Sequence, residues 1–325
     1  MTDAAWLEAV DLAPPTWSGR DDGPEPEHAR WHHAVRGYAA DAAPGVAVIG
    51  FASDEGVRRN AGRPGQVDGP DALRAALAPL ALERPLTIHD AGTVVAGTAL
   101  EDGQERLGRA IAGLIDAGQL PIALGGGHEI AYGSYLGIAD TAARAARPRL
   151  GVLNLDAHFD LRSAPRASSG TPFRQLLERE EALGRSVDYA VIGISEPSNT
   201  RALFDTAAQH GVRWLLDDES RTPAAVDGFL DTFLDGIDLL HLTIDLDVLP
   251  AWIAPGVSAP AASGVPLEVV QHVCDRASAS GKLALVDVAE LNPAFDIDGR
   301  TARVAARLIH RIATRRASLP APATT

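Results

Sequence analysis

Four short segments of the sequence bring together histidines and carboxylates, the residue types that bind metal ions and transfer protons. They are GGGHE, DAHFD, TIDLD and AELNP, at residues 125–129, 156–160, 243–247 and 289–293. Each follows or ends a short apolar run rich in β-branched residues, which is typical of a buried strand. The candidate metal ligands in these segments are His128, Asp156, His158, Asp160, Asp245 and Asp247.

The spacing within two of these segments favours a single shared site. Side chains at alternate positions of an extended chain project to the same side, so Asp156, His158 and Asp160 converge, as do Asp245 and Asp247. Four ionised aspartates held together would repel one another unless cations neutralised them. Two divalent ions would balance this charge, and oxygen and imidazole ligands favour Mn²⁺ over Mg²⁺ or Fe²⁺. We therefore predict a pair of metal ions that activates a bridging water.

The elements that must position these residues alternate along the chain from Val46 onward. Eight apolar runs are typical of strands, at residues 46–51, 86–92, 120–127, 149–158, 189–194, 212–218, 237–247 and 282–291. Five segments between them have helical spacing, at residues 70–81, 101–118, 174–184, 200–211 and 266–281. This alternation predicts an α/β fold with a mostly parallel sheet, either open or closed into a barrel. Both architectures gather active-site residues at the carboxyl ends of the strands.

Composition and charge exclude several classes of protein. The 325 residues are 46% hydrophobic and 22% charged, as in folded domains, and the net charge of −14 argues against nucleic-acid or anionic-membrane partners. No apolar run approaches the roughly 18–20 residues of a membrane span, and the N-terminus lacks a secretion-signal pattern, so we expect a cytoplasmic protein. Residues 1–42 are polar and are predicted to form an irregular N-terminal extension that wraps a single catalytic domain over residues 43–325.

In order and spacing, the four segments resemble the signature blocks of the ureohydrolases, the family of arginase, agmatinase and formimidoylglutamase. Residues 50–74 are similar to the first active-site loop of that family. The resemblance implies an arginase-like three-layer α/β/α sandwich with an eight-stranded, mostly parallel sheet, in place of a barrel. It also implies a homo-oligomer, a trimer or hexamer, with two Mn²⁺ per subunit. One ion would be bound by His128, Asp156, Asp160 and Asp245, and the other by Asp156, His158, Asp245 and Asp247.

Within the family, several segments resemble the formimidoylglutamase branch, among them WSGRDDG, FASDEGVRRN and SSGTPFRQL. Arginase-like members carry a histidine where Ser169 stands here, so a histidine proton shuttle is absent at this position. The implied reaction is manganese-dependent hydrolysis of a small linear amidine, N-formimidoyl-L-glutamate, to L-glutamate and formamide by a metal-bridging hydroxide. Glu290 would orient the amidinium group, and Asp160 would pass a proton to the departing nitrogen.

The positive charge of two loops supports this substrate. Formimidoylglutamate carries two carboxylates, and arginine is the natural bidentate partner of a carboxylate. Arginines stand in the loop after the DAHFD segment and in the earlier loop, at positions 58, 59, 63, 162, 166 and 174. Arg162 is the strongest candidate, since it lies two residues beyond Asp160. The predicted substrate-binding residues are Arg162, Ser169, Arg174 and Asn60.

Three alternatives stay open at this point. Another ureohydrolase, acting on guanidinobutyrate, arginine or agmatine, would release urea in place of formamide. A metal-binding protein without catalysis would keep the ligands but show no metal-dependent turnover. A dinuclear phosphoesterase would be expected to carry an Asn-His-Asp cluster, which the sequence lacks.

Overall fold

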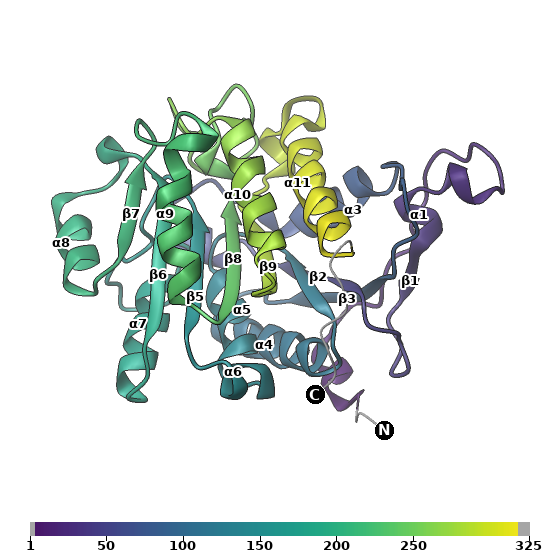
Figure 1. Cartoon of the computed structure of the whole chain (residues 1–325), viewed down its shortest axis with the longest axis horizontal. Helices are drawn as coiled ribbons and strands as arrows, with labels where there is room; N and C mark the ends of the chain where they lie inside the picture. The colour runs from purple at the N-terminus through teal and green to yellow at the C-terminus, as the bar shows by residue number, and fades with distance from the viewer. Residues whose placement is uncertain (1–3, 318–325) are drawn as a thin grey trace.

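A single parallel sheet forms the centre of the computed structural model, which describes residues 4–317 (Figure 1). Its nine strands are ordered β1-β3-β2-β4-β9-β8-β5-β6-β7, and every neighbouring pair is parallel. The strands are β1 (Val35–Gly37), β2 (Val46–Ala52), β3 (Ile88–Val95), β4 (Leu120–Leu124), β5 (Leu150–Leu155), β6 (Val187–Ile194), β7 (Arg213–Leu216), β8 (Leu239–Asp245) and β9 (Leu283–Ala289).

The predicted parallel sheet is confirmed, but the predicted number of eight strands is too low by one. The eight apolar runs correspond to β2 through β9, whereas β1 lies within the N-terminal segment and pairs with β3 at one edge of the sheet. Three residues are too few for an alternating pattern to stand out in a sequence, which is why this strand was not predicted. The extension was expected to be irregular, but it also contains the short helix α1 (Trp31–Ala34). The predicted extension begins at residue 1 and the predicted catalytic domain ends at residue 325, and of these two segments residues 1–3 and 318–325 lie outside the described residues.

Two tryptophans of the N-terminal segment attach it to the sheet and to the last helix. The indole of Trp17 donates to the Asp90 carboxylate on β3 at 2.8 Å, and the indole of Trp31 donates to His310 Nδ1 at 2.9 Å. Trp31 is fully buried. Buried indole groups contribute a large apolar area and usually satisfy the N–H, as both do here.

Helices cover both faces of the sheet, which confirms the predicted three-layer sandwich (Figure 1). One face is covered by α3 (Gly69–Leu77), α9 (Pro223–Gly236), α10 (Leu267–Ala279) and α11 (Arg300–Ala317). The other is covered by α4 (Leu100–Asp116), α5 (Ile130–Ala139), α7 (Pro172–Ala182) and α8 (Arg201–Gln209), and α6 (Ala142–Ala146) packs against α4 and α5. The short helix α2 (Glu55–Arg59) follows β2.

Three of the longer helices, α5, α9 and α11, were not among those predicted from the sequence. Helix α5 shows why in one case, because its sequence IAYGSYLGIA is apolar on almost every side and eight of its ten residues are buried. Such a helix has no polar face, so the three- and four-residue spacing that marks an amphipathic helix is missing. The five helices that were predicted correspond to α3, α4, α7, α8 and α10.

A buried ionic cluster fastens α7 to α5 and α6. Glu180 accepts hydrogen bonds from the Tyr135 hydroxyl at 2.6 Å, from Arg144 at 2.9 Å and from Arg185 at 2.6 Å. Glu180 and Arg144 are almost completely buried. Replacing Glu180 with alanine should lower the free energy of unfolding by about 3–5 kcal/mol, because it leaves the buried Arg144 charge without a carboxylate partner.

Equilibrium urea unfolding measures this difference, and Asp205→Ala on α8 is the matched control. Asp205 faces Arg201 at 3.8 Å, but both side chains are largely exposed. Exposed pairs of this kind contribute only about 0.2–1 kcal/mol. Equal decreases in the free energy of unfolding of the two variants would show that the buried cluster stabilises the protein no more than an exposed ion pair does.

Candidate metal centre

Four adjacent strands in the middle of the sheet, β4, β9, β8 and β5, end at the same edge and deliver the four polar segments. Their register brings the strand ends level, since Leu124 pairs with Val288, Asp245 with Ala289 and Leu155 with Ile244. The segments that follow these ends are therefore neighbours in space although they are far apart in the sequence. Ligand sites of open parallel sheets lie at this carboxyl edge.

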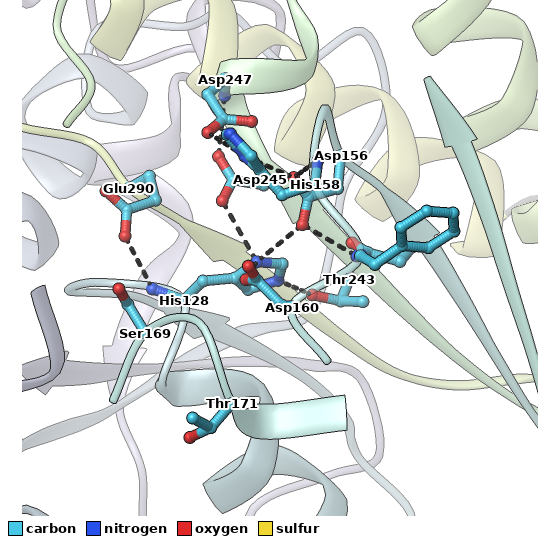
Figure 2. Close-up of polar contacts among 12 residues, drawn as sticks. His128, Asp156, His158, Asp160, Ser169, Thr171, Thr243, Asp245, Asp247 and Glu290 are labelled. Carbon is cyan, nitrogen blue, oxygen red and sulfur yellow. Dashed lines mark hydrogen bonds and ion pairs between the residues drawn. The ribbon is translucent and has the colours of Figure 1, made fainter. Parts of the chain in front are cut away.

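The first group of ligand atoms surrounds the imidazole of His128, which is 1% exposed. Its Nδ1 atom lies 3.0 Å from Asp156 Oδ2, 3.0 Å from Asp160 Oδ2 and 3.1 Å from Asp245 Oδ2. Figure 2 shows the three carboxylates turned toward this ring. The structure thus brings together the four residues that the sequence analysis assigned to one ion.

The second group surrounds His158 and shares Asp156 with the first. His158 Nδ1 lies 3.1 Å from Asp247 Oδ2 and 3.4 Å from Asp156 Oδ1. The two oxygens of Asp156 therefore face different histidines, an arrangement in which one carboxylate can bridge two ions. Asp245 Oδ2 faces His128 in the first group, and its Oδ1 accepts from the backbone N–H of Asp247 at 2.8 Å, so its role as a second bridge stays a prediction.

The geometry of the first group fits a cation. Two donor atoms about 2.1 Å from one ion and at right angles to each other lie about 3.0 Å apart, which matches the separations around His128 Nδ1. This nitrogen is buried without a hydrogen-bond partner in the described chain. A buried nitrogen lone pair beside three carboxylates is costly without a partner, and a cation between them would pair with all four. Histidine and aspartate are ligands that suit Mn²⁺.

Electrostatics point the same way. Burial raises the pKa of Asp245 well above its ordinary value, and the nearby charges of Asp247 and Asp156 raise it further. Burial also raises the pKa of Asp160, with the charge of Asp156 adding to it. Carboxyl groups that are costly to ionise together indicate a site made to hold cations.

Two of the predicted site residues have a left-handed backbone, which residues other than glycine rarely adopt. The φ angle is +48° at Asp160 and +72° at Glu290. Strained residues of this kind concentrate at functional sites, where the surrounding structure holds them in place. In both cases the turn comes after a central strand and aims a carboxylate at the ligand cluster (Figure 2).

Glu290 lies beside the cluster and is 3% exposed. Its Oε1 accepts from the backbone N–H of His128 at 3.0 Å, and its Oε2 accepts from the Gln66 amide at 3.0 Å. Burial raises the pKa of Glu290 to about 7, with the charges of Glu129 and Asp247 contributing to the same direction. A cationic group placed against this carboxylate would offset the cost of its burial.

A cavity of about 200 Å³ opens onto the ligand cluster. Of the predicted substrate-binding residues, Asn60, Arg162 and Ser169 line it, and the Asn60 amide donates to the Ser169 hydroxyl at 3.1 Å. The Arg162 guanidinium is exposed and forms no hydrogen bond or ion pair with any other residue in the part of the chain that the structure describes. It is therefore available to a ligand in the cavity.

Arg174 does not line this cavity, and its predicted role in substrate binding stays a prediction. Its guanidinium donates to Glu178 one helical turn along α7, at 2.7 Å, and lines an adjoining hollow that Arg162 also borders. Arginines of the earlier loop are also engaged elsewhere: Arg59 pairs with Glu55 and Glu101. Among the loop arginines, Arg162 alone lines the cavity beside the metal ligands within residues 4–317.

Two polar residues that support the site were not predicted. Gln66 orients Glu290, as described above, and Glu129 accepts from the Ser53 hydroxyl at 2.7 Å and from the Gly56 backbone N–H at 3.0 Å. Glu129 thereby ties the loop after β2 to the turn that carries His128. Its place beside His128 in the GGGHE segment was a usable signal, whereas Gln66 was marked only by its position in residues 50–74, which resemble the first active-site loop of the family.

No helix within residues 4–317 combines the length and the apolar character needed to cross a membrane.

The model of the Arginase family matches residues 44–314. The chain is 65% identical over 309 residues to a formimidoylglutamase of Nocardia farcinica, covering 94% of this chain and 98% of the relative. It is 60% identical over 316 residues to a formimidoylglutamase of Rhodococcus opacus, covering 95% and 98%.

Two solved structures show the same architecture. A formimidoylglutamase from Bacillus subtilis superimposes with a TM-score of 0.81 at 22% identity, covering 93% of this chain and 97% of that one, a likeness in fold. A Trypanosoma cruzi formiminoglutamase crystallised with Mn²⁺ superimposes with a TM-score of 0.76 at 30% identity, covering 85% and 95%.

Proposed function

The chain belongs to the arginase family and is a hydrolase of that family, and we propose that it converts N-formimidoyl-L-glutamate and water to L-glutamate and formamide with two Mn²⁺ ions. The observation that carries this proposal is the pair of histidine–carboxylate groups that share Asp156. The identity to two formimidoylglutamases over almost the whole chain supports the substrate, and the Mn²⁺ of the Trypanosoma cruzi protein supports the metal.

The proposed ligands are His128, Asp156, Asp160, Asp245, His158 and Asp247. When bound there, two divalent ions lower the pKa of a water molecule and stabilise negative charge that develops on the substrate. The residues around them supply the remaining functions: they bind the substrate, orient its amidinium group and accept or donate protons.

Glu290 is proposed to pair with the amidinium group. Its carboxylate borders the cavity. The hydrogen bond from the backbone N–H of His128 holds this carboxylate beside the ligand cluster. When water adds to the amidinium carbon, this carbon becomes tetrahedral and its nitrogens change position. The Glu290 carboxylate is already held in place, so it can stabilise the nitrogens in their positions in the tetrahedral intermediate. Asp160, which lines the same cavity, is proposed to deliver a proton to the glutamate nitrogen as the C–N bond breaks.

Arg162 is proposed to bind a carboxylate of the substrate. Replacing it with alanine should raise KM for formimidoylglutamate about 10–100-fold, because a charge-assisted hydrogen bond is worth about 1.5–3 kcal/mol. The value of kcat should change less, since the lost contact lies away from the reacting carbon. Steady-state kinetics measure the split, with Arg201→Ala on α8 as a control whose side chain is 93% exposed. An unchanged KM would remove Arg162 from the substrate site.

A second candidate reaction is hydrolysis of a guanidino compound with release of urea. The cluster and Glu290 would suit this reaction equally, but Ser169 stands where arginase-like members carry a histidine, and Arg162 would repel the cationic end of agmatine. Cytoplasmic location and assembly into trimers or hexamers stay predictions that accompany the proposal.

A substrate panel tests the proposed function. The Mn²⁺-loaded protein is incubated separately with formimidoylglutamate, arginine, agmatine, guanidinobutyrate and a generic phosphoester. Formamide and glutamate from the first compound alone are expected. Urea from a guanidino compound would keep the metal site and change the substrate, phosphate release would indicate a phosphoesterase, and no turnover would indicate a metal-binding protein without catalysis.

A further inference from the structure

A line of four buried polar side chains runs from the metal-facing histidine into the sheet. His128 Nε2 lies 3.0 Å from Thr243 Oγ1, Thr243 donates to Asp287 Oδ1 at 2.6 Å, and Asp287 Oδ2 lies 2.6 Å from His241 Nε2. His128 is 1% exposed and the other three are fully buried. Figure 2 shows the first of these contacts, on the side of the imidazole away from the aspartates.

Adjacent strands build this line. His241, Thr243 and Asp245 occupy alternate positions of β8 and so share one face of the sheet, and Asp287 pairs with Thr243 across the ladder to β9. The intervening residues of β8 are apolar and belong to the core on the opposite face. Polar side chains buried inside a parallel sheet are costly unless each is hydrogen-bonded, so a connected set of them indicates a role beyond packing.

The polarity of the hydrogen bonds decides which nitrogen of His128 carries a proton. Asp287 accepts at both oxygens, one from Thr243 and the other from His241. A threonine hydroxyl has a single proton, so Thr243, which donates to Asp287, can only accept from His128. His128 Nε2 must therefore be the protonated nitrogen, and the Nδ1 lone pair is left facing Asp156, Asp160 and Asp245.

We propose that Thr243, itself oriented by Asp287 and His241, is a positioning residue that holds His128 in the tautomer and ring orientation needed to bind one of the two metal ions. The proposal rests on the metal site of the proposed function and goes beyond it in assigning these three residues. Partners of metal-binding histidines fix the ring in this manner and typically contribute about 10–100-fold to metal affinity or activity.

The second histidine lacks such support, which makes the effect specific to one site. Within residues 4–317 the polar contacts of the His158 ring all involve Nδ1, and no side chain hydrogen-bonds to its Nε2. His128 contacts the first group of carboxylates and His158 the second, with Asp156 common to both. Loss of the Thr243 hydroxyl should therefore weaken one Mn²⁺ and leave the other close to its original affinity.

Two substitutions separate the hydroxyl from the shape of the side chain. Thr243→Val keeps the branched shape and removes the hydroxyl, whereas Thr243→Ser keeps the hydroxyl and removes a methyl group. Metal-free wild type and variants are titrated with MnCl₂, and free Mn²⁺ is counted from its electron paramagnetic resonance signal. In Thr243→Val one of the two ions should bind about 10–100-fold more weakly. Thr243→Ser should bind both as the wild type does.

Thermal unfolding of each metal-free protein checks that the variants fold. If Thr243→Val does not fold, Asp287→Asn, which keeps the size of the side chain and removes its charge, should weaken the same ion. Unchanged affinity for both ions, or equal weakening of both, in a folded variant would overturn the positioning role while leaving the proposed function intact. A wild-type protein that binds no Mn²⁺ would instead overturn the proposed function.

Discussion

Replacing Asp156 with alanine is expected to remove both metal ions and to lower activity by more than about 10³-fold. This loss exceeds the 10–100-fold that is typical when a residue that only hydrogen-bonds to a metal ligand is replaced. The reason is that Asp156 is the one carboxylate of the cluster whose two oxygens face both histidines, at 3.0 Å and 3.4 Å. Metal analysis after gel filtration gives the number of ions retained, and formamide release gives the activity.

Asp247→Ala is the matched control for this prediction, because the Asp247 carboxylate faces the histidine of the second group and not His128. This variant should retain one ion per chain, whereas Asp156→Ala should retain none. Two ions retained by Asp156→Ala would contradict the shared role of this carboxylate. The same measurement on Asp245→Ala decides whether Asp245 bridges as well, as the family pattern implies, or serves the first ion alone: loss of both ions would indicate a bridge, and retention of one would indicate a single site.

Replacing Glu290 with glutamine should lower kcat/KM for formimidoylglutamate by about 10²–10³-fold while leaving both metal ions in place. The substitution keeps the size of the side chain and removes the negative charge that faces the amidinium. Glu290 holds its position through Gln66 and the backbone of His128 and is not among the ligand atoms grouped around either histidine.

Kinetics and metal content must be measured together for this variant, with Glu268→Gln on the exposed face of α10 as the control. A Glu290→Gln protein with full metal content and undiminished kcat/KM would remove Glu290 from the catalytic site. Loss of metal in that protein would mean that Glu290 supports the ligands and does not act on the substrate.

The residues of the proposed metal site and most of the fold could be predicted from sequence because the signals are local. Apolar runs mark the central strands, and His128, Asp156, Asp245 and Glu290 stand at or just beyond their ends. The structure brings the ligand side chains together through turns and not through the extended alternation that the sequence analysis assumed, because Asp156, His158 and Asp160 follow the end of β5 and Asp247 lies in the 3₁₀ helix Leu246–Val248. The parallel alternation of strands and helices then brings the separate segments to one edge.

Other features depend on partners that a single segment does not reveal. Strand β1 exists because three residues of the N-terminal segment pair with β3, and helix α5 is apolar because it is covered on nearly all sides. Gln66 and Asp287 acquire their roles from contacts with residues more than 40 positions away. The pairing of Arg174 with Glu178 was visible in the sequence as a four-residue spacing within a helical pattern, whereas the hollow that Arg174 shares with Arg162 was not.

The central claim is that the shared histidine–carboxylate cluster forms a two-manganese hydrolytic site for formimidoylglutamate. The most direct measurement is a titration of the metal-free protein with Mn²⁺ in the presence of this substrate, with formamide release and bound metal recorded at each step. The account predicts negligible release without metal and a maximum at two bound ions per chain. Full activity in the metal-free protein, or saturation with a single ion, would contradict it.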